Sequence, residues 1–370
     1  MINRNQIASI IQKKKFTLKK NIPIAIFGTG TFAYDLYKAL NIKGYTVDFF
    51  VEKQKFIKKR ETYGECKIIS DLHLIKQKKQ IQVLVGIHNR DADIYQIELL
   101  LKQNQNLNIA LPQEYYYLFE DILGWRFWLS SANFLLKTTN VNKLNKIFKI
   151  LADNESKNRL LDIFYFRLGL KNEYGCFVDM EKQYFNNLTI SDKKKKISYC
   201  DIGAYDGDTI LEAINEMNVS ELYAFEPSKT NYKKLLKRIN HLDIPNICLP
   251  LGVSNKFNEL SFMDSEQSNE AGRIGEAGNK TINVISLDNS FNTSLNFIKI
   301  DVEGFEKDVI DGATKLIRKH LPVMAISLYH NAWDLWELPS LIKKINPSYN
   351  LYIRQHGFNS FDCILYAIPF

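Results

Sequence analysis

Cysteine is scarce in this chain and is never spaced for metal binding. The 370 residues include five cysteines, an odd number, and no two of them form a C-x-x-C pair. They are Cys66, Cys176, Cys200, Cys248 and Cys363. Cys200 and Cys248 lie inside apolar, strand-like runs, where a reduced cysteine behaves as a small hydrophobic residue. The spacing therefore predicts neither a zinc site nor a disulfide framework.

Long apolar segments are also missing. The N-terminus has no apolar region of the signal-peptide kind, and no apolar run approaches the roughly 18 residues of a membrane span. We therefore expect a cytoplasmic chain without stable membrane insertion. The net charge of +8 is modest. Lysine runs such as 193–196 are better explained as solvated faces and loops than as a nucleic-acid footprint, so we expect no nucleic-acid partner.

The length and the hydrophobic pattern indicate more than one domain. Residues 1–112 and 196–370 each alternate strand-like apolar runs with helical patterns and are predicted to be α/β domains. Between them, 113–195 lacks strand alternation and carries aromatic residues at helical spacing, which is typical of the core of a helical connector. Helices are expected in it near residues 126–137, 141–152 and 155–170.

A first glycine turn follows the earliest buried strand, in residues 28–33. Gly28, Gly30 and Ala33 fit the pattern G-x-G-x-x-[GA], and an acid, Glu52, ends the next apolar run about 20 residues on. Such a turn can hold a dinucleotide. The segment is short for a complete dinucleotide fold, however, and glycines also permit a tight turn without any ligand. Both interpretations stay open.

A second glycine turn follows an apolar run that ends in Asp201. Gly203 and Gly207 lie in the turn, a helical pattern begins at Asp208, and the next apolar run ends in Glu226. A strand, a glycine turn, a helix and a strand tipped by an acid form a unit that binds adenosine-bearing cofactors. The glycines let the backbone come close to the ligand, and the acid takes the ribose hydroxyls.

The remainder of this domain predicts a mostly parallel sheet. Residues 258–286 are expected to form a β-hairpin, 296–304 and 322–330 are buried strands, and 307–319 is a helix. Two last apolar runs are joined by a turn at Gly357 and predict a terminal antiparallel pair. This is the layout of a class I methyltransferase, a Rossmann-like sheet with a C-terminal antiparallel hairpin.

The segment from about residue 183 to the end resembles the FkbM family of S-adenosylmethionine-dependent methyltransferases. The motifs that carry the resemblance are Tyr184-Phe185, D-I-G-A-Y-D-G from Asp201, Glu226-Pro227, Leu287-Asp288 and K-I-D-V-E-G-F-E over 299–306. The resemblance implies S-adenosylmethionine as the cofactor and covers roughly half of the chain.

The second glycine turn suits the amino-acid end of that cofactor. S-adenosylmethionine has no pyrophosphate, so it does not need a complete dinucleotide glycine set. We expect Asp201 and the backbone around Gly203, Ala204 and Tyr205 to bind the amino-acid end. Gly207 permits the turn into the following helix.

The adenosine end of the cofactor points to residues further along the chain. Glu226, at the tip of the second strand, can accept both ribose hydroxyl protons as a carboxylate. Val253 and Ser254 follow the third strand, where this fold usually packs adenine. Ligands of open α/β sheets bind at the carboxyl ends of the strands, which is where these residues lie.

The catalytic candidates end the next two strands. Methyl transfer is an in-line displacement, and an alcohol acceptor must also lose its proton to a base or to a metal that lowers its pKa. Asp301 and Glu303 end the fourth strand, and His330 and Asn331 end the fifth, so we expect them to converge. His330 is the preferred proton acceptor because its ordinary pKa lies near neutrality. Alternatively, Asp301, Glu303 and His330 hold a divalent metal, or His330 is structural.

Glu306 begins the next helix, and we assign it as an N-terminal charge favoured by the helix dipole. The chain has Asp301-Val-Glu-Gly304 where enzymes that methylate nucleic-acid base nitrogens typically have [DN]-P-P-[YF]. This difference favours an oxygen acceptor. Relatives in the FkbM family often methylate hydroxyls of sugars or natural products, so the resemblance points to such a substrate.

The N-terminal domain is similar to small Rossmann-like domains of sugar-modifying enzymes, some of which bind a nucleotide-sugar. His88 and Asn89, at a strand end, could face such a ligand, and the domain could instead mediate assembly, including homo-oligomer formation. Together these patterns predict a sugar O-methyltransferase that acts on a nucleotide-sugar or a surface-glycan precursor. The alternatives are an NAD(P)-dependent oxidoreductase that uses the first glycine turn, although no clear catalytic Ser-Tyr-Lys set is present, and a non-catalytic nucleotide-sugar-binding protein. An RNA- or protein-directed methyltransferase is only weakly supported by the scattered lysines.

Overall fold

The computed structural model describes residues 2–56, 62–63, 66–263, 273–274, 278, 280–291 and 293–370. The chain divides into two compact units that interleave along the sequence. Unit 1 contains Met1–Lys146, Asn158–Asp179 and Gly357–Asp362, and unit 2 contains 147–157, 180–356 and 363–370. The segment predicted as a helical connector is shared between the two units.

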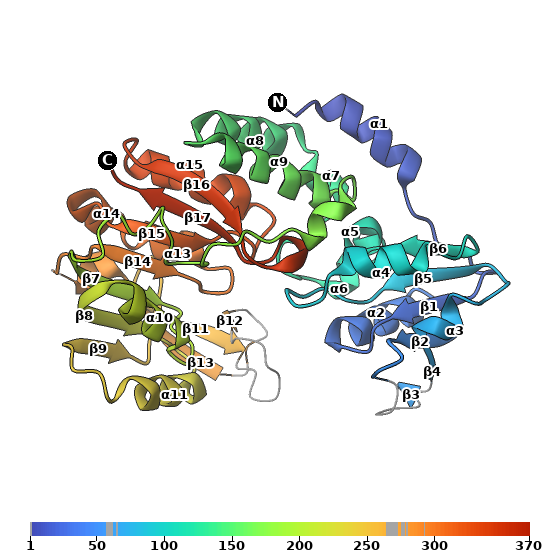
Figure 1. Ribbon diagram of the computed structural model, residues 1–370, viewed down its shortest axis with the longest axis horizontal. Coiled ribbons are helices and arrows are strands. Elements are labelled where there is room, and N and C mark those ends of the chain that lie inside the picture. Colours follow the sequence, from blue (N-terminus) through green and yellow to red (C-terminus); the bar gives the residue numbers. More distant parts are fainter. Residues whose placement is uncertain are drawn as a thin grey trace. The chain divides into compact units, whose positions relative to one another are not determined.

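Unit 1 contains a six-stranded sheet in the order β3-β4-β2-β1-β5-β6 (Figure 1). All neighbouring strands are parallel except β3, which runs antiparallel to β4. The strands are β1 (Ile24–Phe27), β2 (Phe49–Glu52), β3 (Thr62–Tyr63), β4 (Cys66–Ser70), β5 (Ile81–Val85) and β6 (Leu107–Ala110). The helices that follow strands are α2 (Thr31–Ile42), α3 (Asp71–Leu74) and α4 (Ile94–Leu101). The central strands β1 and β5 are buried throughout, as expected of a parallel sheet covered on both faces.

The remaining helices before the second sheet are between 3 and 14 residues long. They are α1 (Arg4–Lys14), α5 (Pro112–Tyr115), η2 (Tyr116–Leu118), α6 (Glu120–Leu123), α7 (Ala132–Leu135), α8 (Thr138–Ile150), α9 (Asn154–Arg167) and η3 (Asn172–Cys176). Two of the three predicted helices are confirmed, as α8 and α9. The prediction of a helix over 126–137 is wrong, because only Ala132–Leu135 is helical.

The failed helix has an identifiable cause. Phe127 adopts a left-handed backbone with φ of 52°, which an α-helix cannot contain. The aromatic spacing in this stretch instead serves tertiary packing within unit 1. Trp128 is buried, and its ring lies 4.9 Å from that of His88. The aromatic spacing therefore predicts the buried position of Trp128 correctly, but it wrongly predicts a helix there.

Unit 2 is built on a seven-stranded sheet in the order β16-β17-β15-β14-β7-β8-β9. The strands are β7 (Lys196–Ile202), β8 (Asn218–Phe225), β9 (Asn246–Leu249), β14 (Phe297–Ile300), β15 (Val323–Ser327), β16 (Asn350–Gln355) and β17 (Cys363–Ile368). The five strands from β15 to β9 run parallel, and β17 is antiparallel to both of its neighbours. The predicted parallel sheet with a C-terminal antiparallel hairpin is confirmed. This order brings the carboxyl ends of β8, β7, β14 and β15 to one edge.

A small second sheet belongs to the same unit, in the order β10-β13-β11-β12. Its strands are β10 (Gly252–Val253), β11 (Asn258–Met263), β12 (Arg273–Ile274) and β13 (Lys280–Ile285). The predicted hairpin over 258–286 is confirmed by the antiparallel pairing of β11 with β13. Most of its connecting loop lies outside the described residues.

The helices of unit 2 are α10 (Asp208–Glu216), α11 (Lys229–Ile239), α12 (Leu287–Ser290), α13 (Glu306–Asp311), α14 (Thr314–His320) and α15 (Asp334–Ile345). The single helix predicted over 307–319 is wrong in one respect, because it is broken into α13 and α14 at Gly312. A Cβ on Gly312 would lie 2.0 Å from the carbonyl oxygen of Ser254, so the chain approaches too closely there for any larger residue. Among the described residues, no helix combines the length and the apolar character needed to cross a bilayer.

Aromatic packing fixes the segment that precedes the seven-stranded sheet. Tyr184 and Phe185 are both buried. The Phe185 ring lies 5.8 Å from that of Tyr199 on β7 and 5.5 Å from that of Phe297 on β14. The Tyr-Phe pair recognised in the sequence therefore anchors its segment on the sheet, with the Tyr184 hydroxyl hydrogen-bonded to Asp301.

Candidate active site

The second glycine turn brings two strand ends into direct contact. Gly203 follows β7 with φ of 81°, and a Cβ at this position would lie 1.8 Å from the carbonyl oxygen of Asp301 after β14. Gly207 has φ of 85° and forms the N-cap of α10. Both positions require the left-handed conformation that glycine adopts without strain. The absence of a side chain at Gly203 therefore allows the turn to pack directly against the loop after β14.

Asp201 lies beneath this turn and is fully buried. Its Oδ1 is 3.0 Å from Nζ of Lys299, and its Oδ2 accepts hydrogen bonds from the hydroxyls of Tyr199 (2.9 Å) and Thr209 (2.6 Å). The side chain thus ties β7 to β14 and to the first turn of α10. Its oxygens are directed to protein groups, so Asp201 supports the turn from inside, and a direct contact with a ligand remains a prediction.

Glu226 closes the same turn from the tip of β8. Its Oε2 accepts a hydrogen bond from the backbone N–H of Tyr205 (2.9 Å), and its Oε1 accepts one from Ser228 (2.7 Å). Burial raises the pKa of Glu226 to about 7, although these two hydrogen bonds lower it. Each carboxylate oxygen can accept a second hydrogen bond. The geometry therefore remains compatible with the predicted ribose contacts.

Val253 and Ser254, the predicted adenine neighbours, lie in and just after β10. Both are buried. The backbone N–H of Ser254 donates to the carbonyl of Ile285 (2.8 Å), which extends the pairing of β10 with β13. The position next to the sheet edge agrees with the expected topology, and their contact with adenine remains a prediction.

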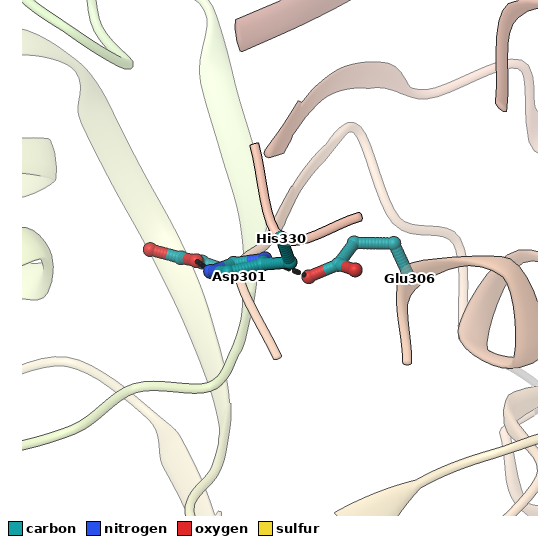
Figure 2. Close-up of side chains that lie close together, drawn as sticks. All are labelled: Asp301, Glu306 and His330. Atoms are coloured by element: carbon teal, nitrogen blue, oxygen red, sulfur yellow. Dashed lines mark hydrogen bonds and ion pairs between the residues drawn. The ribbon is translucent and has the colours of Figure 1, made fainter. Parts of the chain in front are cut away.

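The structure brings Asp301, Glu303 and His330 together, as the strand order predicts. Nε2 of His330 lies 3.4 Å from Oδ1 of Asp301 and 3.4 Å from Oε2 of Glu303. The imidazole is fully buried, whereas the two carboxylates are partly accessible. Figure 2 shows the ring of His330 between the carboxylates of Asp301 and Glu306. These four residues form what we name the acid–histidine cluster: Asp301, Glu303, Glu306 and His330.

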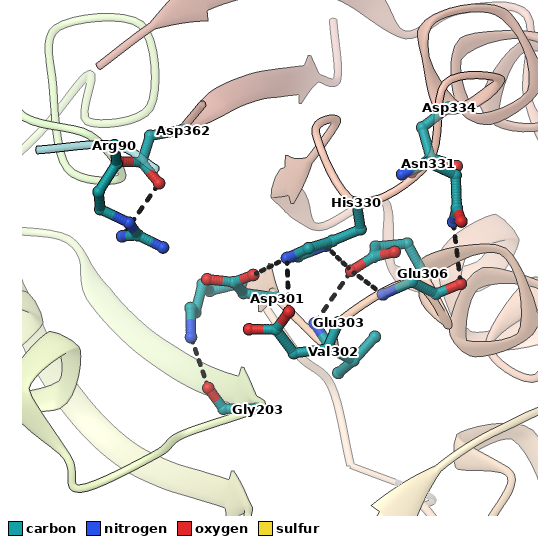
Figure 3. Close-up of polar contacts among 12 residues, drawn as sticks. Arg90, Gly203, Asp301, Val302, Glu303, Glu306, His330, Asn331, Asp334 and Asp362 are labelled. Atoms are coloured by element: carbon teal, nitrogen blue, oxygen red, sulfur yellow. Dashed lines mark hydrogen bonds and ion pairs between the residues drawn. The ribbon is translucent and has the colours of Figure 1, made fainter. Parts of the chain in front are cut away.

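Glu306 is the member of this cluster that the sequence did not reveal. The prediction that it starts a helix is confirmed, since α13 begins there, but the side chain is fully buried and is not a simple N-terminal surface charge. Its Oε1 lies 2.7 Å from Nδ1 of His330 and accepts a hydrogen bond from the backbone N–H of Val302 (3.0 Å) (Figure 3). Glu306 therefore orients the imidazole from behind.

Two neighbours complete the rear of the cluster. The backbone N–H of Asn331 donates to Oδ2 of Asp334 (2.7 Å), and its amide donates to the carbonyl of Gly304 (3.2 Å). Burial, and next the charge of Glu306, raise the pKa of Asp334 well above its ordinary value. Asn331 thus binds the loop after β14 to the start of α15.

The charges around His330 change its expected role. Burial lowers its pKa, but the charges of Glu306, Glu303 and Asp301 outweigh burial and raise the pKa to about 10. An imidazole that carries a proton on both nitrogens has no lone pair for another. At neutral pH without a metal, the partly accessible carboxylates are therefore better proton acceptors than His330.

The cluster also has the composition of a metal site. Ligand atoms of Asp301, Glu306 and His330 lie within 4.8 Å of one another. Nδ1 of His330 is hydrogen-bonded to Glu306, so Nε2 is the nitrogen that faces Asp301 and Glu303. A carboxylate hydrogen-bonded to the far nitrogen of a metal-bound histidine is a common arrangement. A divalent cation on Nε2 would require the neutral imidazole. The residues therefore fit a metal as well as a charged imidazole.

Tyr184 fixes the remaining oxygen of Asp301. Its hydroxyl donates to Oδ2 of Asp301 at 2.9 Å. Oδ1 of the same carboxylate faces His330. The carboxylate is thus held on both sides, and its orientation is set by the packed segment before β7.

The first glycine turn, in unit 1, has different surroundings. Gly28 has φ of 113°, and Gly30 is the N-cap of α2. The acid expected to reach a ribose, Glu52, accepts hydrogen bonds from the Thr29 hydroxyl and from the backbone N–H of Lys53. Ala33 is buried under the turn. The structure thus forms the predicted strand, turn and helix, and ligand binding at the turn remains a prediction.

His88 and Asn89 are engaged within unit 1. Nε2 of His88 lies 3.2 Å from the carbonyl oxygen of Arg126, and its ring packs 4.9 Å from that of Phe361. Burial lowers the pKa of His88 to about 3, so the ring is neutral. Asn89 accepts hydrogen bonds from the backbone of Asp91 (3.1 Å) and of the next residue. These contacts favour a structural role for both side chains.

The sheet order of unit 2, with its C-terminal antiparallel hairpin, its glycine turn after β7 and its acid at the tip of β8, defines a class I methyltransferase fold. Residues 201–360 match the family model described as the methyltransferase FkbM domain. The resemblance to the FkbM family that the motifs predict is therefore confirmed over these residues.

The known proteins that are similar to this chain include an enzyme from Haloferax volcanii and a solved structure from Methylobacillus flagellatus KT. The hexuronic acid methyltransferase AglP of Haloferax volcanii is 28% identical over 123 residues, which cover 32% of this chain and 50% of that protein. The matched part thus spans only half the length of that relative. The crystal structure of methyltransferase FkbM from Methylobacillus flagellatus KT superposes with a TM-score of 0.75 at 18% identity and covers 98% of this chain and 93% of that one. At this identity the likeness establishes the fold alone.

Proposed function

We propose that the protein is an S-adenosylmethionine-dependent O-methyltransferase that acts on a hydroxyl of a sugar. One observation carries the proposal: Gly203 packs against the carbonyl of Asp301, so the second glycine turn adjoins the acid–histidine cluster. Methyl transfer needs a donor site and a proton-accepting site within a few ångströms of each other. The edge of the sheet formed by β8, β7, β14 and β15 supplies both.

The donor occupies the second glycine turn in this proposal. The backbone of Gly203, Ala204 and Tyr205 binds its amino-acid end, Gly207 allows the entry into α10, and Glu226 takes the ribose. Val253 and Ser254 lie on the adenine side. Asp201 acts through its buried contacts, which hold the turn in shape.

The chemical step is a displacement at the methyl carbon. Bound S-adenosylmethionine would supply the methyl group: the acceptor oxygen would bond to the methyl carbon as the carbon–sulfur bond breaks, and the sulfur would leave as a neutral thioether. The hydroxyl proton passes to Asp301 or Glu303, which general-base catalysis requires to lie within hydrogen-bond reach of the acceptor. His330, held by Glu306, keeps these two carboxylates in place.

A divalent cation is the alternative way to activate the acceptor. Asp301, Glu303 and Nε2 of His330 would hold it, and it would lower the pKa of the acceptor hydroxyl. One measurement distinguishes activation by a metal from activation by a carboxylate base. Activity that disappears with a chelator and returns with magnesium, manganese or zinc supports the metal, whereas activity that survives exhaustive chelation supports a carboxylate base.

A sugar acceptor is supported by the similarity to a hexuronic acid methyltransferase. An oxygen acceptor is favoured by Asp301-Val-Glu-Gly304, which stands where enzymes that methylate base nitrogens have [DN]-P-P-[YF]. A nucleotide-sugar or a glycan precursor in the cytoplasm is the form of substrate that we infer, and no nucleic-acid partner is part of the proposal.

The decisive experiment starts from the donor. Calorimetric titration of the wild type with S-adenosylhomocysteine should give saturable binding that Glu226→Ala weakens strongly. No binding to the wild type would contradict the proposal. Titration with NADH in the same buffer tests the oxidoreductase alternative. Methyl transfer from labelled donor to uronic acids and nucleotide-sugars then identifies the acceptor class, with RNA and unrelated protein as negative controls.

A separate variant tests the cluster. His330→Ala should lower the rate of methyl transfer and leave the affinity for S-adenosylhomocysteine nearly unchanged, because the histidine lies on the acceptor side. Full activity in this variant would remove His330 from the mechanism.

A further inference from the structure

Lys299 is a buried charge in the middle of the sheet. It lies on β14, whose four residues are all buried, and its side chain is only 4% exposed. It pairs in register with Asp201 on the neighbouring strand β7. A lysine in such a place loses its hydration, so it must be compensated by partners of opposite charge or by strong hydrogen bonds.

Lys299 has both kinds of partner. Its Nζ lies 3.0 Å from Oδ1 of Asp201 and donates a hydrogen bond to the carbonyl of Gly203 at 2.7 Å. Burial lowers the pKa of Lys299, but the charges of Asp201 and Asp301 outweigh burial and raise the pKa. The lysine is therefore charged, and the two acids that compensate it lie at the ends of two different strands.

The contact with Gly203 determines the shape of the second glycine turn. The carbonyl of Gly203 belongs to the peptide plane that also contains the N–H of Ala204. That N–H and the N–H of Gly203 both donate to the carbonyl of Phe225 at 3.0 Å. The first peptide of the turn is thus fixed from two sides, by Phe225 on β8 and by Lys299 on β14.

A second contact links the lysine to the acceptor side. Nζ of Lys299 lies 5.5 Å from the centre of the Tyr184 ring, within the range of a cation–π interaction. The hydroxyl of this tyrosine is the donor to Oδ2 of Asp301. Lys299 therefore touches the turn directly and reaches Asp301 through its charge and through Tyr184.

We propose that Lys299 is a positioning residue that sets the second glycine turn relative to Asp301. The inference deepens the proposed function and rests on it, since the turn is taken as the donor site and Asp301 as part of the acceptor site. Lys299 itself touches neither ligand in this account. It holds the turn in the shape that binds the donor and keeps that turn in register with the acid that faces the acceptor.

The simpler explanation is that Lys299 only neutralises Asp201. The two explanations separate in the double variant Asp201→Asn/Lys299→Met, which removes both charges together and so leaves no uncompensated ion in the core. It also removes the donor to the Gly203 carbonyl. Lys307→Met is the matched control, because Lys307 is a half-exposed lysine on α13 whose Nζ lies 2.8 Å from Oδ2 of Asp311.

Three measurements on these proteins decide the question. The double variant should melt close to the wild type, bind S-adenosylhomocysteine about tenfold or more weakly, and exchange the backbone amides of residues 203–208 faster in the absence of ligand. The control should match the wild type in all three. Wild-type affinity and wild-type exchange in the folded double variant would overturn the proposal and leave charge balance as the role of Lys299.

If the double variant does not fold, a single variant provides an alternative test. Lys299→Met alone removes the same donor to the Gly203 carbonyl and keeps Asp201 unchanged. Unchanged exchange over residues 203–208 in this variant would also overturn the proposal. Failure of the wild type to bind S-adenosylhomocysteine contradicts the proposed function instead, and the exchange measurement still tests the contact between Lys299 and the turn.

Discussion

The two glycine turns of this protein invite comparison because the one that fits the sequence pattern better has the less suggestive surroundings. The first turn, at Gly28, Gly30 and Ala33, matches the dinucleotide fingerprint, and its acid is bonded to Thr29. The second, at Gly203 and Gly207, is incomplete as a fingerprint. Yet Gly203 contacts Asp301 directly, and a cluster of acids and a histidine follows. The comparison shows that the residues at neighbouring strand ends indicate the function of a glycine turn better than the glycine pattern itself does.

The histidines near the two turns sharpen this contrast. His88 packs among aromatic rings, and burial lowers its pKa to about 3. His330 is fully buried, but the charges of Glu306, Glu303 and Asp301 raise its pKa to about 10. Both follow a buried strand of a parallel sheet. Only the second is surrounded by groups that can bind or move a proton.

The largest effect is expected from alanine in the second turn. Gly203→Ala places a Cβ 1.8 Å from a backbone oxygen that cannot move aside, and we expect a loss of about 4 kcal/mol or more in the free energy of unfolding, with no measurable donor binding. In Gly28→Ala the nearest atom is a side-chain carbon of Ile87 at 2.8 Å, so the loss should be about 2 kcal/mol, with donor binding intact. Thermal unfolding and calorimetry measure both. Loss of donor binding in both variants would make the turns equivalent.

A somewhat smaller effect is expected at Glu306. The pKa of His330 is about 10 in the folded protein, above its ordinary value of 6.5. The ion pairs of His330 therefore stabilise the folded state fully below about pH 6.5, and this stabilisation is lost as the pH rises through about 10. Glu306→Gln should therefore lower the free energy of unfolding by about 3 kcal/mol at about pH 6 and by less at about pH 10. Urea unfolding at the two pH values measures this, and an equal loss at both would contradict the charged state of His330.

Asp301 tests the chemistry and not the fold. Asp301→Asn keeps an oxygen for the Tyr184 hydroxyl but removes the negative charge, so the turnover rate should fall about a hundredfold with little change in affinity for S-adenosylhomocysteine. Glu52→Gln, the corresponding change beside the first turn, should leave turnover unchanged. Comparable losses in the two variants would mean that the first turn takes part in methyl transfer.

The smallest effect is expected at Glu226. Its pKa rises from 4.5 to about 7 on folding, so the folded protein binds the proton more tightly and loses stability as the pH rises from about 4.5 to about 7. Relative to Glu226→Gln, which cannot titrate, the wild type should lose about 2 kcal/mol between about pH 5 and pH 8. Parallel stability curves for the two proteins would show that burial does not disfavour the charged carboxylate.

Much of the fold follows from local pattern, and the failures have physical causes. The parallel strands, the terminal hairpin and the convergence of Asp301 with His330 could be predicted, because buried strands and their order leave a clear periodicity. The helix over 126–137 could not be corrected from sequence, since the left-handed Phe127 serves contacts with distant residues.

The site was predictable in outline and not in its supporting contacts. Glu306 has the sequence signature of a helix start, and only the packing of β15 beside β14 shows that its carboxylate meets His330. Lys299 stands in a familiar motif, but its hydrogen bond to Gly203 depends on the register of β14 with β7. These two contacts join residues 24 and 96 positions apart, and no local pattern encodes them.

The interleaving of the two units has a consequence for synthesis on the ribosome. Unit 1 includes Gly357–Asp362, and within it the side-chain amide of Asn359 donates to the carbonyls of Asn89 and Ala92. Domains commonly fold in the order in which they are made. Unit 1 therefore cannot complete its own hydrogen bonds until residues 357–362 have been translated. The first unit therefore stays incomplete during synthesis while the strands β7 to β16 are produced.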